Sequence, residues 1–158
     1  MRSLIIVCTL TSLLLAFPAS AADDIALCGK LEGWTHYHAS AFGSKSRAGW
    51  QKDSISSGKT ALKRLSPGDH DILYIDTTGN IFSYKQDGAQ IYTVRSSKTE
   101  IALIVLGKRG TIEFYHFYAD SEGSLKMDWG QNKGHSVLMP KSTLMTANCS
   151  FIKFNIKN

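Results

Sequence analysis

Short apolar stretches alternate with turn-forming residues along most of this chain. Glycine, often beside Ser, Asn, Asp or Pro, recurs at short intervals between residues 43 and 134. The stretches between these glycines are rich in Ile, Val, Tyr, Phe and Thr, which fit the pleated surface of a sheet. Evenly spaced short strands separated by turns are typical of an all-β sandwich or barrel. The pattern therefore predicts a single antiparallel domain of about eight to ten strands, with at most one short helix.

The clearest hairpin joins residues 71–76 to residues 81–85. The connecting residues 77–80 end in Gly-Asn, a pair that adopts the positive φ of tight hairpin turns. Asp76 follows the first strand, where an aspartate side chain bonds nearby backbone groups. We therefore expect Asp76 to stabilise this turn.

Three other stretches differ in their apolar pattern. Residues 101–106 are apolar at every position, which predicts a central strand covered on both faces. Residues 124–129 alternate, so Leu125, Met127 and Trp129 should face the core. The last stretch, residues 142–154, is long enough for a strand that bends or contains a bulge.

Residues 50–65 are harder to interpret. They fit one or two helical turns, around 53–57 or 60–65, or a strand with a basic rim. The number of strands leaves room for extended loops, which we expect at residues 43–58 and 130–141.

The N-terminus has the pattern of an export signal. Arg2 precedes an apolar run over residues 4–17, Pro18 interrupts it, and Ala19-Ser20-Ala21 is a small-x-small cleavage site. The run of about 14 residues is shorter than the roughly 20 that span a bilayer. We therefore expect a signal peptide at residues 1–21 and a periplasmic or secreted protein, residues 22–158, with no membrane span after cleavage. That chain has 158 − 21 = 137 residues, the size of one domain.

The charge balance is mildly basic. The full chain has 18 Lys and Arg against 13 Asp and Glu, and loss of Arg2 leaves 17 − 13 = +4. The cations are scattered through expected turns, and an exported chain without a nucleic-acid motif argues against nucleic acid as a partner. A mild positive charge suits an anionic partner, such as a lipid headgroup surface, an acidic glycan or an acidic protein. Lys108-Arg109, at the tip between two apolar strands, is the most notable cationic pair.

Two cysteines remain after the signal, which contains Cys8. In an oxidising compartment an even pair predicts a disulfide, here Cys28–Cys149. It would close a loop of about 120 residues, for which the chain-entropy model gives an upper figure of about 4–5 kcal/mol. A thiol active site is the alternative, but neither cysteine has a nearby His or a Cys-x-x-Cys spacing. The bridge would make the first and last strands neighbours.

His36 and His38 are the candidate metal ligands. Residues two apart on a strand share a face, and two imidazoles on one face can bind one metal ion. A third ligand would have to come from His70, His116, His135 or a carboxylate elsewhere. The alternative is an aromatic, half-exposed strand without a metal.

Residues 112–118 form the most aromatic stretch. As a strand they place Phe114, His116 and Tyr118 on one face, and Glu113, Tyr115 and Phe117 on the other. Core and sheet surface is one interpretation. A ligand pocket with His116 as its polar member is the other.

The sequence has no phosphate loop, nucleotide fingerprint, Gly-x-Ser-x-Gly elbow or zinc-protease motif. We therefore expect a non-enzymatic binding protein of the bacterial envelope, without a cofactor. Its partner would be an envelope protein, a glycan or a small-molecule ligand. The mild positive charge suits an anionic one. The candidate contact residues are Trp34, Trp50, Lys108, Arg109, His116 and Tyr118. The alternative function is a small metal-dependent or hydrolytic enzyme, binding a divalent metal, that uses His36, His38 and His116.

Overall fold

The computed structural model describes residues 22–39, 48–108, 110–134 and 140–154. These residues form nine strands and no helix, which confirms the predicted all-β class and strand number. The strands are β1 (Asp23–Tyr37), β2 (Gly49–Ser66), β3 (Asp69–Ile75), β4 (Ile81–Ser83), β5 (Gln90–Ser96), β6 (Glu100–Leu106), β7 (Thr111–Ala119), β8 (Leu125–Lys133) and β9 (Lys141–Ile152).

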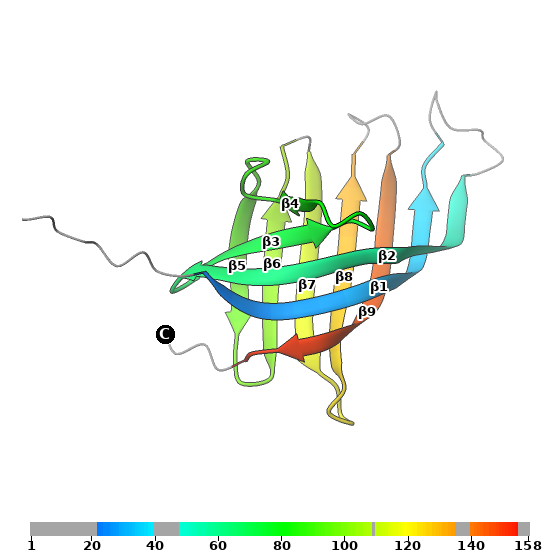
Figure 1. Ribbon diagram of the computed structural model, residues 1–158. Coiled ribbons are helices and arrows are strands. Elements are labelled where there is room, and N and C mark those ends of the chain that lie inside the picture. Colours follow the sequence, from blue (N-terminus) through cyan, green and yellow to red (C-terminus); the bar gives the residue numbers. More distant parts are fainter. Residues whose placement is uncertain (1–21, 40–47, 109, 135–139, 155–158) are drawn as a thin grey trace, which may run out of the picture.

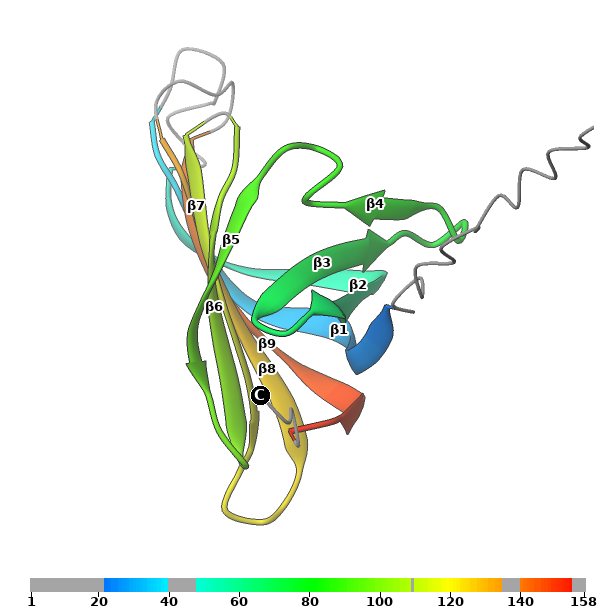
Figure 2. The ribbon, with the colours of Figure 1, turned by 90° about the vertical axis from the view of Figure 1, so that its left-hand side faces the viewer.

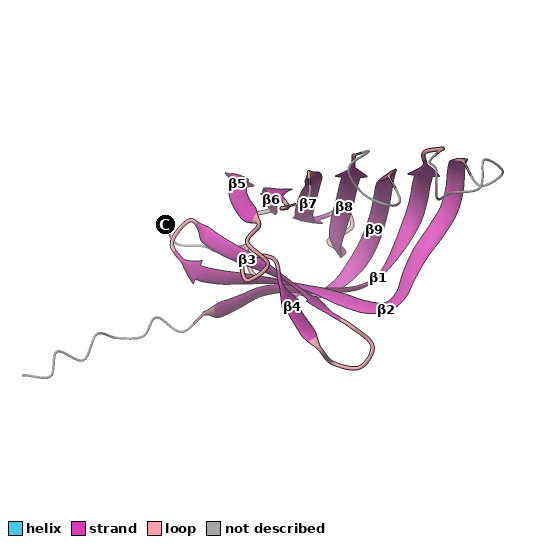
Figure 3. Cartoon of the chain, turned by 90° about the horizontal axis from the view of Figure 1, so that it is seen from above, coloured by secondary structure: helices cyan, strands magenta, loops and turns pink. Residues whose placement is uncertain are grey.

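All nine strands belong to one antiparallel sheet, in the order β4-β3-β2-β1-β9-β8-β7-β6-β5. The first and last strands, β1 and β9, are therefore neighbours in its middle. Figure 1 shows β5 to β8 standing upright while β2 and β3 cross in front of them. Seen from the side and from above, the sheet curls into half a barrel with a concave and a convex face (Figures 2 and 3).

Irregular pairing bends the central strands. Between Gly29 and Leu31, β1 advances by two residues while β2 advances by four. Against β9, β1 has an extra residue between Gly29 and Glu32. Lys30 lies within this irregularity and has a φ of 47°, in the left-handed region. Extra residues of this kind bend a strand and increase its twist, which lets β1, β2 and β9 sweep across the concave side.

The core fills the concave side. Phe117 and Met127, from the upright strands, are fully buried against Leu62 and Ile72 from β2 and β3. The curl is tight enough for β3 to contact β5 although six strands separate them in the sheet order. The core is thus enclosed by two parts of the same sheet.

Several sequence predictions are confirmed. The hairpin pairs Ile75 with Ile81. In its turn, Asp76 accepts hydrogen bonds from Thr78 and from Asn80, and these bonds lower the pKa of Asp76 to about 2. In β8, Met127 and Trp129 are buried, and β9 contains the expected register shifts.

The prediction that residues 101–106 are covered on both faces is wrong. Ile101, Leu103 and Val105 are buried, but Ile104 and Leu106 on the convex face are 38% and 39% exposed. The cause is the architecture, because β6 is next to the edge strand of a single sheet whose convex face is not covered by another described element.

Residues 50–65 belong to the long strand β2, so the helical interpretation is wrong and the strand interpretation is correct. The expected loops are shorter than predicted. Residues 49–58 lie in β2 and residues 130–133 in β8. The remaining parts at 40–47 and 135–139 lie outside the described residues.

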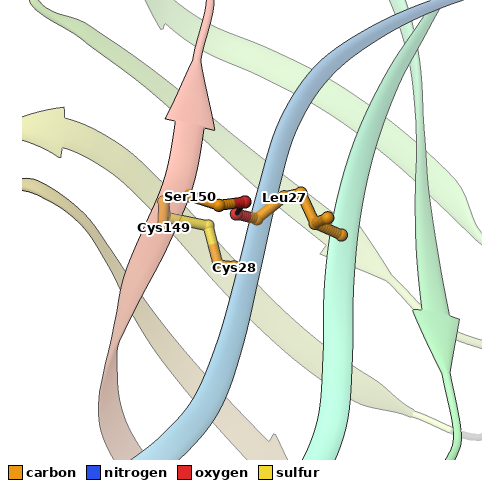
Figure 4. The surroundings of a disulfide bond; sticks show 4 residues. All are labelled: Leu27, Cys28, Cys149 and Ser150. Atoms are coloured by element: carbon orange, nitrogen blue, oxygen red, sulfur yellow. Dashed lines mark hydrogen bonds between the residues drawn. A yellow bond between two sulfur atoms is a disulfide. The ribbon is translucent and has the colours of Figure 1, made fainter.

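The predicted disulfide is present. Cys28 and Cys149 are directly opposite each other in the β1–β9 pair and are bonded through their sulfur atoms (Figure 4). Beside the bridge, the Ser150 hydroxyl donates a hydrogen bond of 3.1 Å to the Leu27 carbonyl. The bridge joins positions 121 residues apart at the centre of the sheet.

Removal of this bridge should lower stability without changing the fold. We expect the Cys28→Ala/Cys149→Ala double variant to lose about 2–5 kcal/mol of unfolding free energy, because its unfolded chain is no longer closed into a loop. Urea denaturation of the oxidised protein, the reduced protein and the double variant measures this loss. Reduced protein and double variant should unfold at similar urea concentrations. Equal stability of the oxidised protein and the double variant would contradict the prediction.

His70 lies where β3 meets β5. It is 2% exposed, and its Nδ1 is 2.9 Å from the Thr93 hydroxyl on β5. Its Nε2 has no hydrogen-bond partner among the described residues. Burial lowers the pKa of His70, and the nearby Arg64 and Lys85 add to this while Asp69 opposes it. His70 is therefore a neutral histidine at the contact that holds the curl.

This histidine should make the protein less stable in acid. Its pKa is lower in the folded than in the unfolded state, so only the unfolded chain gains a proton as the pH falls below about 6.5. The free energy of unfolding should drop with a slope of at most about 1.4 kcal/mol per pH unit from this group. Urea denaturation of wild type and His70→Asn between about pH 7.5 and 5 tests this. The variant should show a shallower slope, and an unchanged slope would rule out His70 as the source.

Candidate ligand-binding site

The concave face changes from apolar to polar toward one end of the sheet. Three successive cross-strand rows describe the change: first Tyr115, Trp129 and Met145; then Glu113, Gln131, Thr143 and Thr35; and finally Thr111, Lys133, Lys141 and Tyr37. The last row lies at the end of the sheet where β6 leads to β7 and β8 leads to β9. This end of the sheet is called the lysine end below. The apolar core therefore opens toward polar and then cationic side chains.

Glu113 is the buried polar centre of this face. It is 5% exposed, and its Oε2 accepts hydrogen bonds from the Tyr84 hydroxyl at 2.9 Å, the Tyr115 hydroxyl at 2.8 Å and the Trp129 indole N–H at 2.8 Å. Its Oε1 accepts one from the Gln131 amide at 2.7 Å. An ionised carboxylate accepts only, and it has room for about four donors. Glu113 thus fixes the orientation of four side chains from β7, β8 and the β4–β5 connection.

The two tyrosines in this cluster remain protonated. Burial, with the Glu113 carboxylate close by, raises the pKa of Tyr84 well above its ordinary value. Burial and the neighbouring Tyr84 and Glu113 do the same to the pKa of Tyr115. Their hydroxyls, 2.9 Å apart, are therefore permanent hydrogen-bond donors rather than proton-transfer groups near neutral pH.

A hollow of about 640 Å³ opens above this cluster, within the range of small-molecule sites. Glu113, Gln131 and Tyr84 form its polar floor, and Tyr74 and Phe82, stacked with ring centroids 6.5 Å apart, form an aromatic wall. Lys108, Lys133, Asp87, Ser83, Ala89, Gly107 and Thr111 complete the lining. A second hollow of about 220 Å³ adjoins it toward Trp129 and Lys141 and shares Tyr74, Tyr84, Gln131 and Lys133.

Lys133 and Lys141 face each other across β8 and β9 at the mouth. Like charges directly opposite in a sheet repel. Burial lowers the pKa of Lys141, Lys133 adds to this, and Asp53 opposes it. Among the described residues, neither lysine has a carboxylate within 4 Å, although the Lys141 ammonium lies 5.8 Å from the Tyr37 ring centroid. The arrangement leaves space for a negative charge.

A second polar network borders the hollow on β1 and β2. Asp53 accepts hydrogen bonds from the Thr35 hydroxyl at 3.0 Å and the Tyr37 hydroxyl at 3.1 Å, and Thr35 lies 3.1 Å from Thr143. Burial alone would raise the pKa of Asp53, but these hydrogen bonds, together with one from the Ser54 backbone and the charge of Lys141, outweigh it and lower the pKa. The network keeps Asp53 charged and engaged with its own strand neighbours.

Most of the residues predicted for ligand contact are elsewhere. Trp34, Trp50, His116 and Tyr118 lie on the convex face, with the His116 and Tyr118 rings stacked 4.8 Å apart. Lys108 is the member of the predicted set that lines the hollow. Arg109 lies outside the described residues.

The histidines do not converge. His36 and His38 share the convex face as expected, with ring centroids 4.9 Å apart, and His36 also contacts Trp50. His38 Nε2 is 3.3 Å from the Ser142 hydroxyl. His116 is three strands away in the sheet order, about 14 Å across the strands at the usual spacing, and four residues further along than the register position of His36. It pairs with Glu100 at 2.9 Å. Within the described part of the chain, no group of three or more His, Cys, Asp or Glu is placed to hold a metal ion.

Four residues of the hollow were not predicted as site residues from the sequence: Glu113, Tyr84, Gln131 and Lys133. One pattern pointed to Glu113, which shares a strand face with Tyr115 and Phe117 and is the charged residue on that face. If the aromatic pair is in the core, the carboxylate must be there too, and it then needs several donors. The other three depend on how distant strands curl together, which local patterns do not encode.

Comparison with protein-family models, with curated proteins and with solved structures gave no match for this chain. The described residues contain no helix long and apolar enough to cross a membrane.

Truncation of Glu113 should be among the most damaging single changes in the protein. In Glu113→Ala, several buried donors lose their acceptor at a cost of about 1–3 kcal/mol each, so we expect a loss of at least about 3 kcal/mol. Urea denaturation followed by near-ultraviolet circular dichroism of Trp129 measures it. Glu122→Ala, an exposed carboxylate in the β7–β8 turn, is the matched control and should change stability by less than about 0.5 kcal/mol. Similar values for the two variants would show that Glu113 does not organise the cluster.

Proposed function

We propose that this protein is a small exported binding protein of the bacterial envelope, without catalytic activity, and that the concave hollow binds a small aromatic or apolar molecule with an anionic group. The observation that supports it most is the combination of an open, aromatic-walled hollow with two lysines at its mouth that pair with no carboxylate in the described part of the chain. The disulfide fits the oxidising compartment to which the N-terminal signal pattern directs the chain.

The chemistry of the lining defines the ligand class. Tyr74 and Phe82 present ring faces to an apolar body. Gln131 and Tyr84 are already bonded to Glu113, so the floor is rigid and costs little ordering entropy when a ligand binds. Lys133 and Lys141 supply the positive charge for a carboxylate, sulfonate or phosphate at the mouth. A buried carboxylate on the floor disfavours a second negative charge deep in the hollow.

A binding experiment with a simple probe tests this proposal. Naphthalene-2-sulfonate combines an aromatic body with one anionic group, and we expect it to bind one-to-one in isothermal titration calorimetry. Lys133→Met/Lys141→Met keeps the side-chain length and removes both charges, so affinity should fall at least tenfold, about 1.4 kcal/mol.

The matched control is Lys98→Met/Lys153→Met, which removes the same charge from exposed positions away from the hollow. Its affinity for the probe should stay within about twofold of wild type. Equal losses of affinity in the two double variants would show that net charge, and not the position of the lysines, causes the effect. If neither naphthalene-2-sulfonate nor 2-naphthoate binds, the proposal is overturned.

A further inference from the structure

The convex face has a band of exposed apolar side chains near the lysine end. Eight residues from six strands form it, between 38% and 63% exposed, and are called the outer belt: Trp34, Trp50, Tyr92, Ile104, Leu106, Ile112, Phe114 and Leu144. Strand register places them in two adjacent rows. The first runs through Tyr92, Ile104, Phe114, Gly130, Leu144 and Trp34, and the second through Leu106, Ile112, Asn132, Ser142, His36 and Trp50.

Scattered exposed apolar residues are ordinary, whereas a contiguous band marks an interaction surface. The next row on the same face, away from the lysine end, is mainly polar, with His116, Asp128, Thr146 and Glu32 in register. Val94 on β5, 61% exposed, is an apolar residue outside the two rows, at a register shift. The outer belt is therefore confined to about the last 7 Å of the sheet, two residues along each strand. Part of it has a local role, because the Phe114 ring covers Gly130, but the other seven side chains do not share that role.

Charge is distributed unevenly along the same axis. At the lysine end, Lys108, Lys133 and Lys141 have no carboxylate within 4 Å among the described residues. The connection before β5 lies at the same end of the sheet and contains Asp87 and Lys85. Lys85 pairs with Asp69. At the opposite end, Lys126 pairs with Asp120 and Arg95 pairs with Glu100.

We infer that the lysine end docks on the surface of an anionic phospholipid bilayer, with the outer belt in the headgroup region. Trp, Tyr and Phe with aliphatic neighbours are the side chains that favour the membrane–water interface. A belt about 7 Å deep matches the 5–10 Å to which interfacial apolar faces penetrate. Cations at that end that form no ion pair with a described carboxylate complement the negative charge of lipid phosphates.

A second copy of the chain fits this face less well. The belt follows the convex side of the curled sheet (Figures 2 and 3). Two convex faces touch over a small area, whereas a stable interface needs about 800 Å² from each partner. Lipid headgroups rearrange around a curved protein surface, and a rigid copy cannot.

Flotation of the full exported chain with lipid vesicles tests the inference. We expect binding to vesicles of equal phosphatidylglycerol and phosphatidylcholine, at least tenfold weaker binding to phosphatidylcholine alone, and a loss of binding between about 0.05 and 0.5 M salt. Trp34 and Trp50 are exposed while Trp129 is buried, so lipid contact should also shift the tryptophan emission to the blue.

Matched substitutions locate the contact. Leu144→Ser and Trp50→Ser each remove one belt side chain, and each should weaken vesicle binding at least fivefold. Ile81→Ser removes a similarly exposed apolar side chain from β4, outside the belt, and should bind as wild type does. Far-ultraviolet circular dichroism confirms that all three variants are folded.

Three results would overturn the inference: no binding to the anionic vesicles, equal effects of the belt and Ile81 substitutions, or a lipid-independent dimer in light scattering that Leu144→Ser abolishes. The last result would identify the belt as an interface between copies. The hollow is tested separately, because Leu144→Ser should still bind naphthalene-2-sulfonate as wild type does.

Discussion

The pairing of β1 with β9 is the constraint on which the rest of the architecture depends. It places β2, β3 and β4 on one side of the sheet and β5 to β8 on the other, and the Cys28–Cys149 bond fixes it at the centre. The irregular register beside Gly29 then bends the joined strands, so that one part of the sheet covers the other. Without this pairing there would be two separate meanders, neither with a second layer to bury its apolar face.

The same strands form both faces of the sheet, but the two faces differ in burial and polarity. In β7, Glu113, Tyr115 and Phe117 face the concave side, where the carboxylate is satisfied by four donors and the aromatic rings fill the core. The alternate residues Ile112, Phe114 and His116 face outward, and the first two remain exposed. One strand therefore contributes to the floor of a polar hollow and to an apolar outer surface within a few residues. The hollow and the outer belt both lie near the lysine end. A ligand in the hollow and a surface against the belt would therefore contact the same end of the protein.

The sequence was most informative where structure depends on near neighbours. The turn at Asp76, the alternation in β8 and the faces of residues 112–118 follow from side-chain periodicity and turn chemistry. The disulfide followed from having a single pair of cysteines to join. The prediction that residues 101–106 are covered on both faces was wrong because an unbroken apolar run does not reveal whether protein covers its second face. The candidate site was missed for a related reason, since Tyr84 and Lys133 reach the hollow only through the curl.

The central position of the last strand has a consequence for how the protein is made. The chain is synthesised from its N-terminus, so β1 is available long before β9, and the two cysteines that join these strands are 121 residues apart. Until β9 follows, the neighbour of β1 that is already available is β2, and the partner of Cys28 is still missing. Contacts between distant residues form slowly because a long loop must first close. Assembly therefore ends in the middle of the sheet, and any truncation at the C-terminal strand removes its central staple rather than an edge.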